Sequence, residues 1–162
     1  MTRTLPTRSA LAVLVTSLVT SLVVAPAASA RADATARLQM TWPASGTVTA
    51  RFGEWRGSRR HDGIDVGMLR TLRLRAVSGG VVEETGYAPG YAGYGKVVVL
   101  DLPGPYYALY AHLSSVGVEV GQRVGKGQRL GLAGCTGSCS GTHLHFEVRK
   151  GSVPVNPLRF LG

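Results

Sequence analysis

Cysteine, acidic residues and long apolar runs are all scarce in this chain, and each scarcity excludes a class of protein. Two cysteines among 162 residues are too few for a disulfide-dense scaffold or a four-cysteine zinc module. Charged residues make up only 17% of the sequence and apolar residues 44%, a balance that excludes disorder driven by charge. Only one apolar run, close to the N-terminus, is long enough to act in targeting. What remains is a single small domain with an ordinary hydrophobic core.

The first thirty residues have the three-part pattern of a secretory signal peptide. Arg3 and Arg8 give a positive start, residues 10–24 form an apolar run, and small residues follow at positions 28–30. The alternative is a membrane anchor, but a run of about fifteen residues is shorter than the ~20 that span a bilayer. We therefore expect residues 1–30 to be cleaved, the protein to be secreted, and no stable membrane insertion.

The remaining sequence predicts an all-β domain over residues 41–162, preceded by a flexible polar leader over residues 31–40. Short apolar runs alternate with turn residues, and no persuasive helical repeat is present. In residues 116–131, glycines recur between branched apolar residues, which predicts short strands joined by tight turns. The strand-like runs are residues 48–52, 73–77, 81–85, 96–100, 106–112 and 143–149.

The four histidines fall within or beside these strand patterns. His61 and Asp65 lie four residues apart, so in an extended segment both side chains project from one face. His143 and His145 share a face for the same reason. A single histidine on a strand is more often a hydrogen-bonded core or surface residue than a metal ligand. That alternative is weakened here because all four histidines, His112 included, lie on segments that could converge.

Zinc chemistry suits this set of side chains. A catalytic zinc site uses three protein ligands, commonly histidine and carboxylate, and leaves the fourth position for water. His61, Asp65 and one of the His143/His145 pair would supply the three ligands. Two histidines would then be left for acid–base work.

Three motifs occur in order along the chain. They are His61-Asp-Gly-Ile-Asp65, Tyr110-Ala-His-Leu113 and His143-Leu-His145-Phe-Glu-Val148. In the second motif, strand alternation places His112 on the face of Tyr110. In this ordered set the chain resembles the lysostaphin-type (LytM-like) zinc metallopeptidase family of peptidoglycan endopeptidases. The resemblance extends over about residues 42–161.

The resemblance assigns the metal ligands and the catalytic residues. It implies that His61, Asp65 and His145 bind one Zn²⁺ per chain, and that His112 and His143 are the catalytic, non-ligating pair. It also implies a small domain of antiparallel β-sheets or a β-sandwich with a groove over the metal. The substrate would be the stem or bridge peptides of peptidoglycan, cut by a monomer associated with the cell wall. Which histidine is the base and which is the acid is left open.

Two classes of function fit these residues. Some members of the resembled family have lost metal ligands and only activate other hydrolases, so an exported, non-catalytic wall-binding module is the alternative. This chain lacks none of the ligands, and we therefore expect an active zinc metalloendopeptidase. Glu147, two residues after His145, is expected to support the site or to lie on the surface, and not to be catalytic.

The chain departs from the family pattern at two loops. Residues 68–73 replace the usual segment after the Asp ligand, and Cys135 and Cys139 occupy a loop that is usually rich in Ser, Thr and Asn. A spacing of four residues suits a small disulfide-closed loop beside the active site, and export would permit the bond. Free thiols or additional metal ligands are the alternatives.

Basic residues outnumber acidic residues by 18 to 9, and arginines flank the first motif on both sides. Arg-rich loops at positions 56–60 and 70–75 could hold an exported domain on anionic wall polymers. The alternative is ordinary solvated arginine. Nucleic acid is not an expected partner, because export separates the protein from it and the sequence carries no recognition motif.

Overall fold

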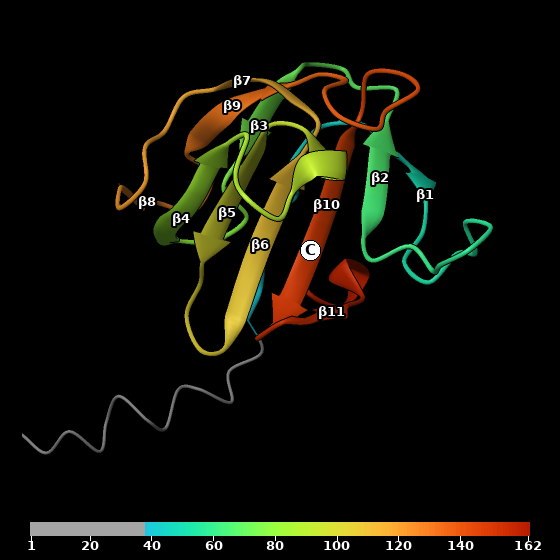
Figure 1. The fold of residues 1–162 in the computed structure, drawn as a ribbon. Coiled ribbons are helices and arrows are strands. Elements are labelled where there is room, and N and C mark those ends of the chain that lie inside the picture. Colours follow the sequence, from blue (N-terminus) through green and yellow to red (C-terminus); the bar gives the residue numbers. More distant parts are fainter. Residues whose placement is uncertain (1–37) are drawn as a thin grey trace, which may run out of the picture.

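The computed structural model of the chain describes residues 38–162, which form two antiparallel β-sheets (Figure 1). The predicted signal peptide, residues 1–30, and most of the predicted leader, residues 31–40, lie outside the described residues. Among residues 38–162, no helix has the length and apolarity that a membrane span needs. The elements in chain order are β1 (Thr47–Ala50), β2 (Ile64–Gly67), β3 (Arg73–Arg75), β4 (Gly80–Gly86), the 3₁₀ helix η1 (Ala92–Tyr94), β5 (Val97–Asp101), β6 (Tyr106–Ala111), β7 (Leu113–Val116), β8 (Arg123–Val124), β9 (Arg129–Ala133), β10 (Leu144–Lys150), β11 (Val153–Val155) and the 3₁₀ helix η2 (Pro157–Arg159).

The two sheets confirm the predicted all-β, antiparallel fold. Within the described residues the larger sheet has eight strands in the order β1-β2-β10-β6-β5-β4-β8, with β11 paired to β10. The smaller sheet has three strands in the order β3-β9-β7 and lies at the top of the view in Figure 1. The Gly-rich stretch forms β8 and the start of β9 as expected. The turn between these two strands includes Gly127, whose φ of 81° suits a residue without a Cβ.

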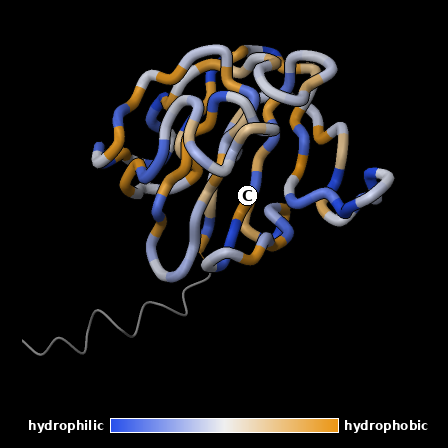
Figure 2. Tube along the Cα trace, viewed as in Figure 1, coloured by the Kyte–Doolittle hydropathy of each residue, from blue (hydrophilic) through white to orange (hydrophobic). Residues whose placement is uncertain are grey.

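The main hydrophobic core lies between the two sheets. From β10 it takes every second residue, Leu144, Phe146 and Val148, which are all fully buried. Tyr110 of β6 packs against Phe146, and its hydroxyl accepts a 2.9 Å hydrogen bond from the amide of Val77. Figure 2 shows hydrophobic stretches along the strands, whereas the connection between β1 and β2 is mostly hydrophilic. Alternation turns the intervening side chains of β10 to the outer face of the larger sheet.

The register between β2 and β10 determines where the polar site lies. His145 of β10 pairs directly with Asp65 of β2, so their side chains lie next to each other on the outer face. Just before β2, Gly63 crosses β10 so closely that a Cβ there would collide with the carbonyl oxygen of Phe146. The glycine thus permits the bend that brings His61 back over Asp65.

Three details differ from the sequence prediction. Residues 51–52 and 76–77, expected within strands, follow the ends of β1 and β3. Strands β7 and β11 were not predicted, because β7 contains two serines and β11 contains a proline, which is tolerated in a strand paired on one side. Met40, the last residue of the predicted flexible leader, is fully buried, and its amide donates to the carbonyl of Phe160 at 2.8 Å. The packed domain therefore includes Met40.

Candidate metal centre

The donor atoms of His61, Asp65 and His145 cluster on the outer face of the larger sheet. Nδ1 of His145 lies 2.9 Å from Oδ1 of Asp65 and 3.0 Å from Nε2 of His61, and this Nε2 lies 3.2 Å from Oδ1 of Asp65. All three residues are buried. Tetrahedral zinc, with bonds of roughly 2.0–2.1 Å, separates its ligand atoms by about 3.3 Å. Two imidazoles and a carboxylate at this spacing therefore fit a zinc ion in both size and donor chemistry.

Each of these histidines is oriented by a hydrogen bond from its other ring nitrogen. Nδ1 of His61 donates to the carbonyl oxygen of Arg51 at 2.9 Å, which leaves the lone pair of Nε2 at the cluster. In His145 the roles are reversed, because Nε2 donates to Oε1 of Glu147 at 2.9 Å and Nδ1 faces the cluster. Such outer hydrogen bonds fix the tautomer and the ring orientation of metal-binding histidines. The two lone pairs and the Asp65 carboxylate therefore converge on one point.

The carboxyl group of Asp65 is held in its ionised form. Burial by itself would raise its pKa, but hydrogen bonds with His145, His61 and Arg56 outweigh burial and hold the pKa well below its usual range. The guanidinium of Arg56 donates to Oδ2, and Oδ1 is the oxygen that faces the histidines. Sequence reasoning placed Arg56 only in an Arg-rich loop, since nothing in its spacing indicates a contact with Asp65.

Behind His145 lies Glu147, a carboxylate with no exposed surface. Its Oε1 also accepts a 2.7 Å hydrogen bond from the hydroxyl of Tyr94, and its Oε2 accepts one of 2.7 Å from Nε of Arg149. Burial alone would raise the pKa of Glu147, but the hydrogen bonds from His145, Arg149 and Tyr94 lower it. Burial and Glu147 together raise the pKa of Tyr94 to about 12, so the phenol remains a donor. Glu147 therefore supports the site and does not lie on the surface.

His112 and His143 form a second pair of imidazoles beside the cluster. Their ring centroids are 4.8 Å apart, and Nε2 of His143 lies 3.8 Å from Oδ1 of Asp65. Nδ1 of His112 donates to the carbonyl of Thr136 at 2.8 Å, and Nδ1 of His143 donates to the carbonyl of Gly141 at 2.7 Å. Nε2 is therefore the nitrogen of each ring that is left to exchange a proton. Burial lowers the pKa of His112, which keeps this ring neutral near pH 7.

The backbone at His112 explains how this side chain reaches the site. Its φ of 63° lies in the left-handed region and separates β6 from β7, and its amide donates to the carbonyl of Tyr94 at 2.9 Å. The expectation that His112 shares the face of Tyr110 is therefore wrong, because Tyr110 packs in the main core while His112 lies beside His143. Strand alternation cannot reveal a single left-handed residue between two strands.

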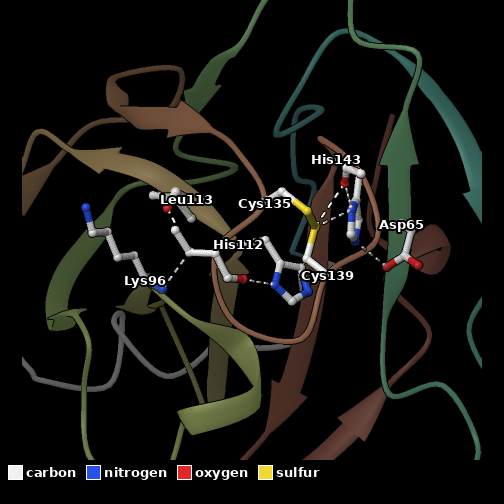
Figure 3. The surroundings of a disulfide bond; sticks show 9 residues. Asp65, Lys96, His112, Leu113, Cys135, Cys139 and His143 are labelled. Carbon is white, nitrogen blue, oxygen red and sulfur yellow. Dashed lines mark hydrogen bonds and ion pairs between the residues drawn. A yellow bond between two sulfur atoms is a disulfide. The ribbon is translucent and has the colours of Figure 1, made fainter.

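The loop between β9 and β10 forms one wall of a groove of about 460 Å³ over the cluster. Cys135 and Cys139 are joined by a disulfide in this loop, with their Cα atoms 5.3 Å apart. Figure 3 shows His143 between the disulfide and Asp65. The groove is lined by Thr49, Arg56, Arg59, His61, Asp65, Gly67, Gly93, Tyr94, His112, Ser138, Cys139, Ser140, Gly141, Thr142, His143 and His145.

Comparison with known proteins gives matches to peptidases and to a hydrolase activator. Residues 59–157, more than half of the chain, match Peptidase family M23. The murein hydrolase activator NlpD of Escherichia coli (strain K12) is 36% identical over 120 residues, which cover 74% of this chain and 30% of that protein. The peptidoglycan DD-endopeptidase ShyA of Vibrio cholerae is 39% identical over 99 residues, which cover 61% of this chain and 22% of that protein. The chain thus spans less than a third of the length of these two relatives.

The fold is shared with a solved peptidase. The antimicrobial peptidase lysostaphin from Staphylococcus simulans superimposes with a TM-score of 0.65 at 28% sequence identity, over 76% of this chain and 52% of that chain. The predicted resemblance to lysostaphin-type enzymes is confirmed by this likeness together with the family match. The chain belongs to Peptidase family M23.

Proposed function

We propose that the protein is an exported zinc-dependent endopeptidase that hydrolyses the peptide cross-links or bridges of bacterial peptidoglycan. The observation that carries the proposal is a complete set of three buried donor atoms beside two imidazoles whose Nδ1 atoms donate to loop carbonyls. Membership of Peptidase family M23 supports peptidase chemistry, and the relative named as a peptidoglycan endopeptidase supports the substrate class.

His61, Asp65 and His145 are the proposed zinc ligands, through Nε2, Oδ1 and Nδ1 respectively. When bound, zinc supplies a Lewis acid that polarises a carbonyl group and lowers the pKa of a water molecule. The protein holds the three side chains in the orientation and ionisation state that zinc binding requires. Arg56 neutralises the outer oxygen of Asp65, and Glu147 holds the ring of His145 in the tautomer that presents Nδ1.

His112 and His143 are the proposed proton carriers. Each ring donates its Nδ1 proton to a loop carbonyl, so each Nε2 can accept a proton from the attacking water. As the water oxygen bonds to the scissile carbonyl carbon and the C–N bond breaks, the resulting imidazolium can return the proton to the leaving amine. The neutral state of His112 near pH 7 suits a base, and the position of His143 beside Asp65 suits contact with the water.

A non-catalytic activator is the second candidate function. It is favoured by the relative NlpD, which is named a murein hydrolase activator and is 36% identical to this chain. An activator needs a surface for the hydrolase that it activates, but it needs neither metal ligands nor a proton carrier. The presence of both sets of side chains favours the enzyme.

Anionic wall polymers are proposed as a second partner. A groove of about 430 Å³ is lined by Trp42, Arg70, Arg73 and Arg75, and none of the described residues that line it is acidic. Guanidinium groups bind phosphate or carboxylate through paired hydrogen bonds, which suits such a polymer. Retention on purified cell walls should fall as salt is raised and in the variant Arg73→Gln, and equal retention under both changes would contradict this binding.

Export is proposed from two features of the chain. Residues 1–30 carry the signal-peptide pattern, and a disulfide persists in oxidising compartments outside the cytosol. N-terminal sequencing of the secreted product should begin at Arg31. A product that retains the first thirty residues would contradict cleavage.

The mature chain with one equivalent of zinc tests the enzyme against the activator. It should clear a suspension of purified peptidoglycan and release new free amino groups, and a chelator should stop both. Mass spectrometry of the released muropeptides identifies the bond that is cut. Binding without new amino groups would favour the activator, and new reducing ends would indicate glycan cleavage instead.

A further inference from the structure

The loop between β9 and β10 orients both histidines of the pair although its own sequence gives it little rigidity. Residues 134–142 consist of glycines, small polar residues and two cysteines. Such a segment has no large apolar side chain to bury and has a high conformational entropy when it is unconstrained. Its carbonyl groups at Thr136 and Gly141 nevertheless accept the hydrogen bonds that orient His112 and His143.

The first half of the loop is anchored to neighbouring segments. Oγ1 of Thr136 donates to the carbonyl of Leu113 at 2.9 Å and accepts from the amide of Lys96 at 3.0 Å. Gly137 has a φ of 73° and approaches Gly95 so closely that a Cβ on Gly137 would collide with the backbone there. The carbonyl of Thr136 is therefore fixed without help from the disulfide.

The second half of the loop, residues 139–142, has no anchor of this kind. Within the described part of the chain, its amides and carbonyls make no backbone–backbone hydrogen bonds. The next backbone hydrogen bond runs from the amide of His143 to the carbonyl of Gly134 at 3.2 Å. The covalent bond from Cys139 to Cys135 therefore ties this half to the anchored half.

The disulfide also packs against the hydrogen bond that orients His143. The sulfur of Cys139 lies 3.0 Å from the carbonyl oxygen of Gly141 and 3.7 Å from Nδ1 of His143, the two partners in that hydrogen bond. Figure 3 shows this contact and the separate position of His112. The two histidines are thus supported differently, one by an anchored carbonyl and one by a carbonyl that depends on the cystine.

We propose that the Cys135–Cys139 disulfide is a positioning element for His143, and that it acts on His143 more strongly than on His112. The inference rests on the proposed role of His143 as a proton carrier. Without the disulfide, the Gly141 carbonyl moves away from Nδ1, and the His143 ring loses its fixed tautomer and direction. The zinc ligands are unaffected, because they are buried on or beside paired strands and are oriented by Arg51 and Glu147.

The first test reads the ring tautomers and does not depend on activity. Nitrogen-15 spectra of the imidazoles are recorded at one pH for the zinc-loaded wild type and for the double variant Cys135→Ser/Cys139→Ser. In the wild type, His112 and His143 should both carry the proton on Nδ1. In the double variant, His143 should change to a mixture of tautomers while His112 keeps its Nδ1 proton.

Thr136→Val provides the matched control, because it removes the Oγ1 hydrogen bonds and leaves the disulfide in place. It should disturb the spectrum of His112 more than that of His143, because the disulfide and the close approach of Gly137 to Gly95 remain. An unchanged His143 spectrum in the double cysteine variant, or equal changes at both histidines, would overturn the proposal.

A reduced wild type covers the case in which the double variant does not fold. Cys135 is exposed and can be reached by a soluble dithiol. The dithiol is oxidised to its own disulfide while the Cys135–Cys139 bond breaks and both sulfurs take up a proton, two electrons being transferred. The folded, reduced protein should show the same selective change at His143, and its absence would count against the proposal.

Activity supplies the second readout. In the double variant kcat should fall by up to about 100-fold, the cost of a small misplacement of a catalytic group, with KM and zinc content unchanged. A fall in zinc content instead of kcat would overturn the positioning role. If the wild type itself cleaves no peptidoglycan, the proposed function fails, and the tautomer spectra still decide whether the disulfide positions His143.

Discussion

The cluster of His61, Asp65 and His145 and the pair of His112 and His143 lie side by side but are built in different ways. Asp65 and His145 face each other across paired strands, and both are buried. His112 lies at a break between two strands, His143 lies just before β10, and both are oriented by loop carbonyls. Sheet register therefore places Asp65 and His145, two of the three proposed ligands, while carbonyl groups of a short loop orient the two proposed proton carriers. Changes in the loop should affect catalysis without affecting the metal, and the following variants test that separation.

Removing a ligand should have the largest effect. Asp65→Ala leaves two imidazoles without the anionic donor, so bound zinc should fall from one per chain to near zero and peptide hydrolysis should fall to background. Zinc content after dialysis and release of amino groups are the measurements. Asp62→Ala is the matched control, since Asp62 pairs with Arg59 and not with the cluster in the described part of the chain, and this variant should keep both zinc and activity. Stoichiometric zinc in Asp65→Ala would show that the cluster is not the metal site.

Removing a proton carrier should leave the metal in place. His143→Ala and His112→Ala should each retain one zinc and lose about 10²–10⁴-fold in kcat, the usual contribution of a general acid or base. Steady-state kinetics beside metal analysis measures both. Loss of zinc from either variant would show that His112 or His143 is needed for metal binding, and would contradict the separation of the two regions.

Glu147→Gln should weaken zinc binding, because Glu147 orients the ring of His145. A neutral amide replaces the buried anion that accepts from His145, so the zinc dissociation constant should rise by about 10–100-fold. Competition with a chromogenic chelator measures this constant. Glu119→Gln, at an exposed position, is the control and should bind zinc as the wild type does. Wild-type affinity in Glu147→Gln would mean that the carboxylate has no part in orienting His145.

Tyr110→Phe should affect only the core and should have the smallest effect. It removes the acceptor for the Val77 amide between the two sheets, and an unsatisfied buried donor costs about 1–3 kcal/mol in the free energy of unfolding. Denaturant unfolding measures the loss, while zinc content and kcat should not change. Tyr87→Phe, which alters an exposed ring, should be neutral. An effect of Tyr110→Phe on zinc binding would show that the core and the cluster are coupled.

Strand periodicity grouped His61 with Asp65 and His143 with His145, whereas the choice of His145 as the proposed third ligand came from the family resemblance. Alternation puts Leu144 and Phe146 in the core and leaves His145 and Glu147 on the other face, but it does not predict the burial of Glu147, which comes from its contacts with Tyr94 and Arg149. The pairing of β2 with β10 could not be predicted from the alternation of side chains along each strand. That pairing joins segments about 80 residues apart, and it was inferred only through the resemblance to a family.

The surroundings of the histidine pair could not be predicted in the same way. The left-handed φ of His112, the contact of Arg56 with Asp65, and the link from Tyr94 to Glu147 all depend on tertiary contacts that leave no periodic signal. The pairing of Cys135 with Cys139 was suggested by spacing and compartment, but its contact with His143 was not. In a loop whose contacts are made by backbone carbonyl groups, the side-chain types do not indicate which residues those carbonyls contact.

Tyr94 joins the two regions through different parts of one residue. Its carbonyl oxygen accepts a hydrogen bond from the amide of His112, and its hydroxyl donates one to the carboxylate of Glu147. A substitution that shifts η1 would therefore act on both regions at once, because both hydrogen bonds come from this one residue.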